Sequence, residues 1–160
     1  MYNNQKSRRT YSQEKNKGNY DKVIKQKFPL KFTDESYVDE ARKIIEIFEG
    51  ENFEIFYNKR KKERLTNTQL RNLLAMTSAV YDEARNNGFD HVNEKIAYLK
   101  VQFIYQSGRN LAVKAFVEVA QLVELVDKIR DLKKMDDLLR FCHYMEALIA
   151  YFKYYGGADK

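Results

Sequence analysis

The stretch FVEVAQLVELV, residues 116–126, decides the fold class, because its residues are compatible with either a strand or a helix. Its valines favour a strand. The polar residues in and around it favour a helix, because they are spaced by four, three, three and four positions: Lys114, Glu118, Gln121, Glu124 and Lys128. On a helix this spacing forms one narrow polar stripe, with apolar residues on all other faces. The pattern predicts one helix over residues 112–130.

Four further helices are predicted, and all five together indicate an all-α fold, a compact bundle of about five helices. The chain has 160 residues but only one proline and six glycines, which favours long helices over a turn-rich β fold. Hydrophobic residues make up 44% of the sequence, enough for a core. The other expected helices cover residues 33–50, 66–86, 91–109 and 135–155.

The helix that starts at Thr66 has the clearest beginning. Thr66 is the expected N-cap, and Gln69 three residues later completes a capping box. Removing the threonine cap should cost about 1 kcal/mol. In the other helices, apolar side chains recur on one face and predict these core residues: Tyr37, Ala41, Ile44, Ile45, Phe48, Val92, Ile96, Leu99, Phe103, Leu138, Phe141, Met145, Leu148 and Phe152.

The N-terminal part differs in composition from the rest. Residues 1–22 have almost no aliphatic side chains, which predicts disorder. In KFPLKF, residues 27–32, apolar residues alternate with lysine and proline, which predicts an extended strip docked along the domain. The expected division is a flexible basic N-terminal extension over 1–32 and a helical domain over 33–157. The aromatic segment NFEIFY, residues 52–57, is compatible with a short helix.

The net charge of +6 is unevenly distributed. Residues 1–31 hold nine Lys or Arg and two acidic residues, a net charge of +7, so the remainder is close to neutral. One interpretation is a solvated, disordered basic tail. The other is a tail that also contacts nucleic acid through a salt-sensitive contact that ignores sequence.

The helix over residues 91–109 has an unusual outer face. In YLKVQFIYQSGRN, residues 98–110, a stripe of Tyr98, Gln102, Tyr105 and Arg109 lies roughly opposite the core positions. Such a face can stack on bases or pack on a protein partner, with Arg109 meeting phosphate or carboxylate. Alternatively, the helix is central and both of its faces are buried.

The sequence offers no catalytic or metal-binding constellation. Two histidines, His91 and His143, and one cysteine, Cys142, are too few for a four-ligand zinc site. Phosphate-loop, dinucleotide-binding and nucleophile-elbow motifs are missing. We therefore expect a non-enzymatic protein without metal or other cofactors.

The expected location is the cytoplasm. A single cysteine cannot form an internal disulfide, which favours a reducing compartment. No membrane association is expected, because the longest uncharged run has 10 residues, against the roughly 20 apolar residues of a membrane span. The polar N-terminus has no apolar segment of a secretory signal.

Three stretches in series resemble the small subunit of the type III-A CRISPR–Cas effector, the Csm complex: LTNTQLRNLLAMTSAVYDEA at 65–84, YLKVQFIYQSGR at 98–109 and FCHYMEALIAYFKYYGG at 141–157. The resemblance implies a helical, non-catalytic subunit. It further implies that copies of the subunit stack into a filament beside the backbone subunits, with the large subunit as another partner. It also implies contacts with the phosphates of crRNA and target RNA that do not read sequence. The long basic N-terminus departs from the family pattern.

The resemblance also supplies candidate RNA contacts. These are basic residues within the matching region, Arg71, Lys100, Arg109 and Lys114, joined by Lys59, Arg60, Lys61 and Lys62. For Arg109 the alternative is a structural role at a helix end. A different class of function stays open, that of a helical protein–protein adaptor or dimerisation module without direct RNA contact. The broad apolar surface expected for residues 112–130 favours that alternative.

Overall fold

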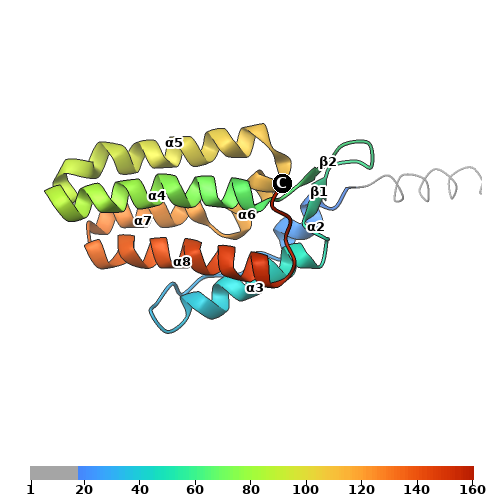
Figure 1. The fold of residues 1–160 in the computed structure, drawn as a ribbon, viewed down its shortest axis with the longest axis horizontal. Coiled ribbons are helices and arrows are strands. Elements are labelled where there is room, and N and C mark those ends of the chain that lie inside the picture. Colours follow the sequence, from blue (N-terminus) through green and yellow to red (C-terminus); the bar gives the residue numbers. More distant parts are fainter. Residues whose placement is uncertain (1–17) are drawn as a thin grey trace, which may run out of the picture.

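The computed structural model describes residues 18–160, in which the long helices run side by side and a short hairpin closes one end (Figure 1). The all-α class is confirmed, with seven α-helices in the described residues rather than about five, and one two-stranded antiparallel sheet. The elements are α2 (Tyr20–Lys25), α3 (Tyr37–Glu49), β1 (Glu54–Phe56), β2 (Lys62–Arg64), α4 (Asn67–Asn87), the 3-10 helix η1 (Phe89–Val92), α5 (Asn93–Arg109), α6 (Leu111–Val119), α7 (Leu122–Leu132) and α8 (Met135–Tyr154).

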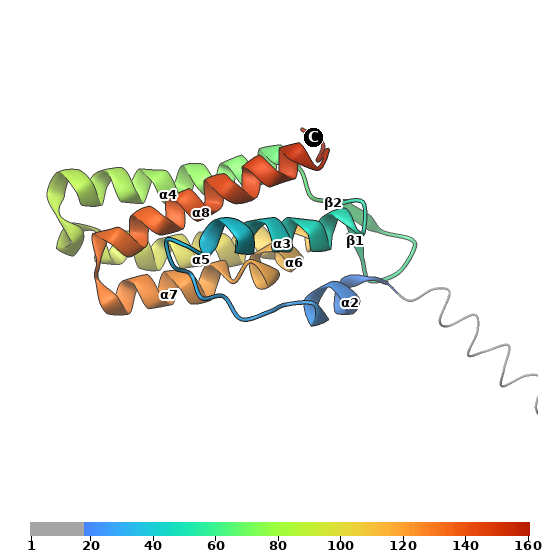
Figure 2. The ribbon, with the colours of Figure 1, turned by 90° about the horizontal axis from the view of Figure 1, so that it is seen from below.

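The core lies between two sets of helices. Helix α8 packs against α3 and α4, and α5 packs against α6 and α7 (Figures 1 and 2). Aromatic rings connect the layers, as in the contact of Phe48 with Phe116, whose ring centroids lie 5.9 Å apart. The core residues predicted for the third and fifth expected helices are all buried: Val92, Ile96, Leu99, Phe103, Leu138, Phe141, Met145, Leu148 and Phe152.

The capping box at the start of α4 is confirmed. The Thr66 amide donates to Gln69 Oε1 at 2.9 Å, and the Gln69 amide donates to Thr66 Oγ1 at 3.4 Å. These bonds satisfy two backbone groups that an uncapped helix leaves without partners. Helix α4 therefore begins where the sequence predicts.

The prediction of one helix over residues 112–130 is wrong, because the helix breaks between α6 and α7. Gln121 has a left-handed backbone (φ 59°), and its side-chain amide donates to the Phe28 carbonyl at 2.7 Å. At the same place the Tyr144 hydroxyl donates to the Ala120 carbonyl at 2.8 Å. A buried hydroxyl needs an acceptor, and a carbonyl released from the helical ladder supplies one. Both halves are nevertheless helical, so the strand interpretation is also excluded.

The first expected helix starts four residues later than predicted, at Tyr37. The cause is Glu40, whose carboxylate accepts from the amides of Lys31 and Phe32 at 2.6 and 3.0 Å and from the Ser36 hydroxyl at 2.7 Å. These bonds fold the preceding segment back over the helix start, with Phe32 in a left-handed conformation (φ 52°). Residues before Tyr37 therefore form a turn instead of a first helical turn.

The disorder predicted for residues 1–22 is wrong for residues 18–22, and residues 1–17 lie outside the described residues. Asn19 pairs with β1: its amide donates to the Phe56 carbonyl at 3.0 Å, and its Oδ1 accepts from the Phe56 amide at 2.9 Å. The backbones approach so closely that a Cβ at Gly18 would lie 2.0 Å from the Phe56 carbonyl oxygen. Val23 of α2 is completely buried. These contacts fix α2 to the hairpin.

The strip predicted for residues 27–32 docks along the domain as expected, but its last residue, Phe32, has a left-handed rather than an extended backbone. It has no helix or strand, and Phe32 is buried while Phe28 and Leu30 pack against the core. The Lys27 ammonium reaches the Glu118 carboxylate of α6 at 3.0 Å. The strip therefore runs across the α6–α7 side of the molecule, as the lower part of Figure 2 shows.

Residues 52–57 do not form the short helix that their composition allowed. Residues 54–56 are instead strand β1, which pairs with β2 in the register Glu54 to Arg64, Ile55 to Glu63 and Phe56 to Lys62. Ile55 is fully buried while its neighbours on the strand are partly exposed, the period-two pattern of a half-buried strand.

Candidate nucleic-acid interface

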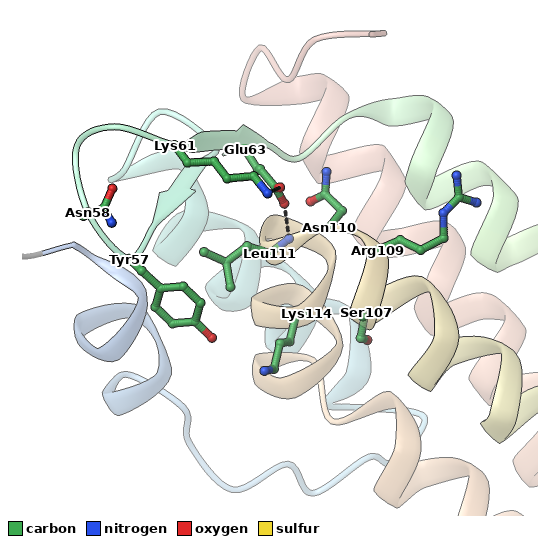
Figure 3. Close-up of a pocket in the computed structure, with 10 residues that line it drawn as sticks. Tyr57, Asn58, Lys61, Glu63, Ser107, Arg109, Asn110, Leu111 and Lys114 are labelled. Atoms are coloured by element: carbon green, nitrogen blue, oxygen red, sulfur yellow. Dashed lines mark hydrogen bonds and ion pairs between the residues drawn. The ribbon is translucent and has the colours of Figure 1, made fainter.

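A cleft of about 300 Å³ lies where the hairpin meets the junction of α5 and α6 (Figure 3). The hairpin contributes one wall and the helical junction the other. The lining residues are Tyr57, Asn58, Lys61, Glu63, Ser107, Gly108, Arg109, Asn110, Leu111 and Lys114. Three of the eight candidate cations therefore line one cleft: Arg109 and Lys114, and Lys61, which lies about 50 residues before them in the sequence.

The helical wall is shaped by Asn110, which ends α5 and caps α6. Its backbone is extended (φ −146°), and its Oδ1 accepts from the Val113 amide at 3.1 Å. Asparagine is a preferred N-cap for this reason. Glu63 of β2 joins the two walls, because its carboxylate accepts from the Leu111 amide, where the helix dipole favours a negative charge.

The three cations of the cleft differ in their contacts. Lys61 Nζ lies 3.5 Å from Glu63 and is thus partly neutralised. Lys114 Nζ lies 5.8 Å from the centroid of the Tyr20 ring, and Arg109 lies 5.7 Å from that of Tyr105. Figure 3 shows the Arg109 side chain directed away from the hairpin wall, so it stands at the rim of the cleft. In the described part of the chain, neither Lys114 nor Arg109 forms an ion pair.

The remaining cations of the hairpin lie beside the cleft. Lys59 and Arg60 are exposed in the turn between β1 and β2, and Lys62 Nζ lies 5.4 Å from the Phe56 ring centroid. Arg71 is exposed on α4, which begins three residues after β2 ends. Within residues 18–160 none of these four has a carboxylate within ion-pair distance. The hairpin end thus carries cations that form no ion pair with the described part of the chain.

Lys100 is separate from this group. Its ammonium lies 3.0 Å from both carboxylate oxygens of Asp127 and ties α5 to α7. It stands nine residues before Arg109, about 14 Å along the helix axis, on the opposite side of α5. Its charge is therefore balanced within the fold, and a contact of Lys100 with RNA stays a prediction.

The outer face of α5 is exposed, so the interpretation that both faces of this helix are buried within the chain is wrong. Tyr98 and Tyr105 are each 61% exposed, and Val101 and Ile104 are also more than half exposed. We call these four residues the α5 face. Exposed apolar side chains in such a group are a common mark of a contact surface.

The described residues gather no group of three His, Cys, Asp or Glu side chains that could hold a metal ion. Cys142 is buried on α8, and desolvation, with smaller contributions from nearby carboxylates, raises the pKa of its thiol to about 12. A thiol with that pKa stays protonated near neutral pH and is a poor nucleophile.

Seven of the ten lining residues were not among the sequence candidates, and three of them shape the cleft: Tyr57, Glu63 and Asn110. A usable signal exists for the first two, because Phe53 and Ile55 alternate with polar residues before a turn rich in Asn and Lys, the pattern of a hairpin. The role of Glu63 depends on Leu111, 48 residues away, and has no local signal.

The sequence is similar to proteins of one known family. A family model described as Csm2 Type III-A matches residues 48–158. A CRISPR system Cms protein Csm2 from Streptococcus thermophilus is 44% identical over 127 residues, which cover 79% of this chain and 97% of that protein. Proteins of the same name from Mycobacterium tuberculosis and Enterococcus italicus are 50% identical over 100 residues and 36% identical over 128 residues. Those alignments cover 60% and 74% of this chain, and 79% and 89% of the relatives.

Proposed function

The chain belongs to the Csm2 family of type III-A CRISPR small subunits, and from that premise we propose that it is a non-catalytic RNA-binding subunit of an RNA-guided interference complex in antiviral defence. Its copies stack into a filament beside the backbone and large subunits of the complex. They bind the backbone of crRNA and target RNA without sequence specificity. The complex acts in the cytoplasm, and none of the described helices has the length and apolarity to cross a membrane.

The group of cations at the hairpin end supports this proposal. Lys59, Arg60, Lys62, Arg109 and Lys114 are clustered there, and none of them forms an ion pair with a carboxylate of residues 18–160. Exposed lysine and arginine side chains of this kind neutralise phosphates and release counterions. Long flexible side chains around an open cleft suit contacts to the backbone, which carry no sequence information. The hairpin end is therefore the proposed RNA surface.

A salt series tests the proposal. For about three neutralised phosphates on single-stranded RNA, log K against log[salt] should have a slope near −2, from about −0.7 per phosphate. In the double variant Arg109→Ala/Lys114→Ala the slope should become shallower, roughly −0.7, and the affinity for two unrelated RNAs should fall equally. We propose that Lys100, whose cation is already paired with Asp127, does not contact RNA, so Lys100→Ala is the matched control and should keep the parental slope. A folded double variant with the parental slope would remove the cleft cations from the RNA site.

A second function has its own supporting observation. The α5 face exposes Tyr98, Val101, Ile104 and Tyr105, which suits contact with another protein better than contact with phosphate. A protein–protein adaptor or dimerisation module without direct RNA contact would use this face. The adaptor function is supported if Tyr98→Ala/Val101→Ser reduces assembly with other subunits and the parent binds no RNA at any salt concentration.

The non-catalytic part of the proposal rests on the sequence and on the arrangement of ionisable groups. His91 and His143 lie on different elements, η1 and α8. The purified subunit should release no product from RNA or ATP, with or without Mg²⁺. Metal-dependent RNA cleavage that co-purifies with the folded subunit and disappears in a His143→Ala variant would contradict it.

A further inference from the structure

The cleft contains an exposed aromatic ring that phosphate binding alone does not use. Tyr57, the first residue after β1, is 56% exposed. Its ring centroid lies 5.0 Å from that of Tyr20 on α2, with the ring planes at 51°. Lys114 Nζ is 5.8 Å from the same Tyr20 ring. Figure 3 shows Tyr57 on the hairpin wall and Lys114 on the helical wall of one cleft.

Hydrogen bonds hold the backbone beside Tyr57, and the Tyr57 ring packs next to the Tyr20 ring. Its chain neighbour, Phe56, exchanges two hydrogen bonds with Asn19, at 3.0 and 2.9 Å, and a third bond joins Asn19 Nδ2 to the Glu54 carbonyl at 2.8 Å. The same Asn19 begins α2, which carries Tyr20. A ring held in this way loses little conformational entropy when a second planar group stacks on it.

We propose that this cleft takes one unpaired nucleotide of the bound RNA, with its base stacked on Tyr57 and its phosphate beside Lys114. The inference rests on the proposed function and specifies which part of the RNA enters the site. An aromatic ring next to a cation is the combination that single-strand binding proteins use. A volume of about 300 Å³ is at the lower end of ligand pockets, roughly 300–1,000 Å³, and suits one nucleotide rather than several.

The charges around the ring favour a polyanion over an acidic peptide side chain. Among the described residues one carboxylate lines the cleft, that of Glu63, and it is engaged by the Leu111 amide and by Lys61. Lys59 and Arg60 stand on the same hairpin and continue the positive surface beyond the cleft. A chain of phosphates can contact all of these cations, whereas a single acidic residue can meet only one or two.

The test uses the full chain and a short single-stranded RNA in which 2-aminopurine replaces adenine. Stacking on Tyr57 should quench the fluorescence of the base when the protein binds. Tyr57→Ala should abolish the quenching and weaken single-strand binding by roughly 5- to 150-fold. Tyr57→Phe should retain both, because stacking needs the ring and not the hydroxyl. Tyr154→Ala, which removes an 81% exposed tyrosine at the end of α8, is the matched control and should behave like the parent.

The outcomes separate this inference from the proposed function. A paired duplex of the same sequence should bind more weakly to the parent and respond little to Tyr57→Ala, because its bases are not free. The inference is overturned if folded Tyr57→Ala keeps the parental affinity and quenching while Arg109→Ala/Lys114→Ala still makes the salt slope shallower. In that case phosphate binding stands without a base site. If the parent binds no RNA, both proposals fail.

Discussion

Replacing Tyr144 with phenylalanine should destabilise the fold through one missing oxygen atom. Tyr144 is completely buried on α8, and its hydroxyl donates to the Ala120 carbonyl at the break between α6 and α7. Burial, reinforced by the nearby Glu40 charge, raises the pKa of this hydroxyl well above its ordinary value, so it stays protonated and able to donate. In Tyr144→Phe the Ala120 carbonyl, on a residue with no exposed surface, loses this donor.

The expected size follows from the cost of a buried polar group without its partner. Such a group costs about 1–3 kcal/mol. For a chain of this length, each kcal/mol lowers the unfolding temperature by about 2–4 °C, so Tyr144→Phe should unfold roughly 2–12 °C below the parent. The volume of the side chain hardly changes, so little of this loss can come from a cavity.

Thermal unfolding followed by circular dichroism at 222 nm measures this difference directly. Tyr154→Phe is the matched control, because it removes the same atom from a side chain that is 81% exposed and should change stability by less than about 0.5 kcal/mol. Equal unfolding temperatures for the two variants would refute the argument. The helix break would then be stabilised by something other than the Tyr144 hydrogen bond.

Further predictions concern a cation pair, the N-terminal segment and acid stability. Lys100→Ala should lose about 0.2–1 kcal/mol of stability in denaturant unfolding, as expected for a partly exposed ion pair, while the salt slope of RNA binding stays parental. A chain that starts at residue 33, the domain boundary expected from the sequence, should unfold at a lower temperature than a chain that starts at residue 18. The shorter chain lacks the buried Val23, and losing the burial of that side chain alone should cost about 1.5–3 kcal/mol of stability. Equal stability would confirm 33–157 as an independent domain. The hydrogen bond from Arg140 lowers the pKa of the Asp34 carboxyl below its ordinary 3.8. The pair should therefore stabilise the fold above that pH and stop doing so as pH falls through the lowered value, so unfolding temperatures of the parent and Asp34→Asn should converge in acid.

The helices could be predicted because their determinants are local. The capping box of Thr66 and Gln69 lies within four residues, and the stripe from Val92 to Phe103 repeats at the helical period. The break at Gln121 could not be predicted, because its determinants are the Phe28 carbonyl and the Tyr144 hydroxyl, which lie 93 residues before and 24 residues after the groups they bind. A polar stripe continues across the break in sequence even though the backbone does not continue as one helix.

The sequence predicted the cations of the candidate site but not which of them lie together in the fold. Nothing in the sequence brings Lys61 to Lys114, because their proximity depends on Glu63 of β2 meeting the start of α6. Likewise, Lys100 could not be separated from the other cations without its partner Asp127, 27 residues later. Composition predicts how many cations there are, whereas tertiary contacts decide which of them remain free for a phosphate.

The most direct test of the central claim is to locate RNA on this subunit inside a reconstituted type III-A complex. Ultraviolet crosslinking followed by mass spectrometry identifies the peptides that touch crRNA or target RNA. We predict crosslinks at residues 57–62 and 109–114, the two walls of the cleft, and their loss in the Arg109→Ala/Lys114→Ala variant. A fully assembled complex in which these peptides carry no crosslink, while other peptides of the same subunit do, would contradict the proposed RNA surface.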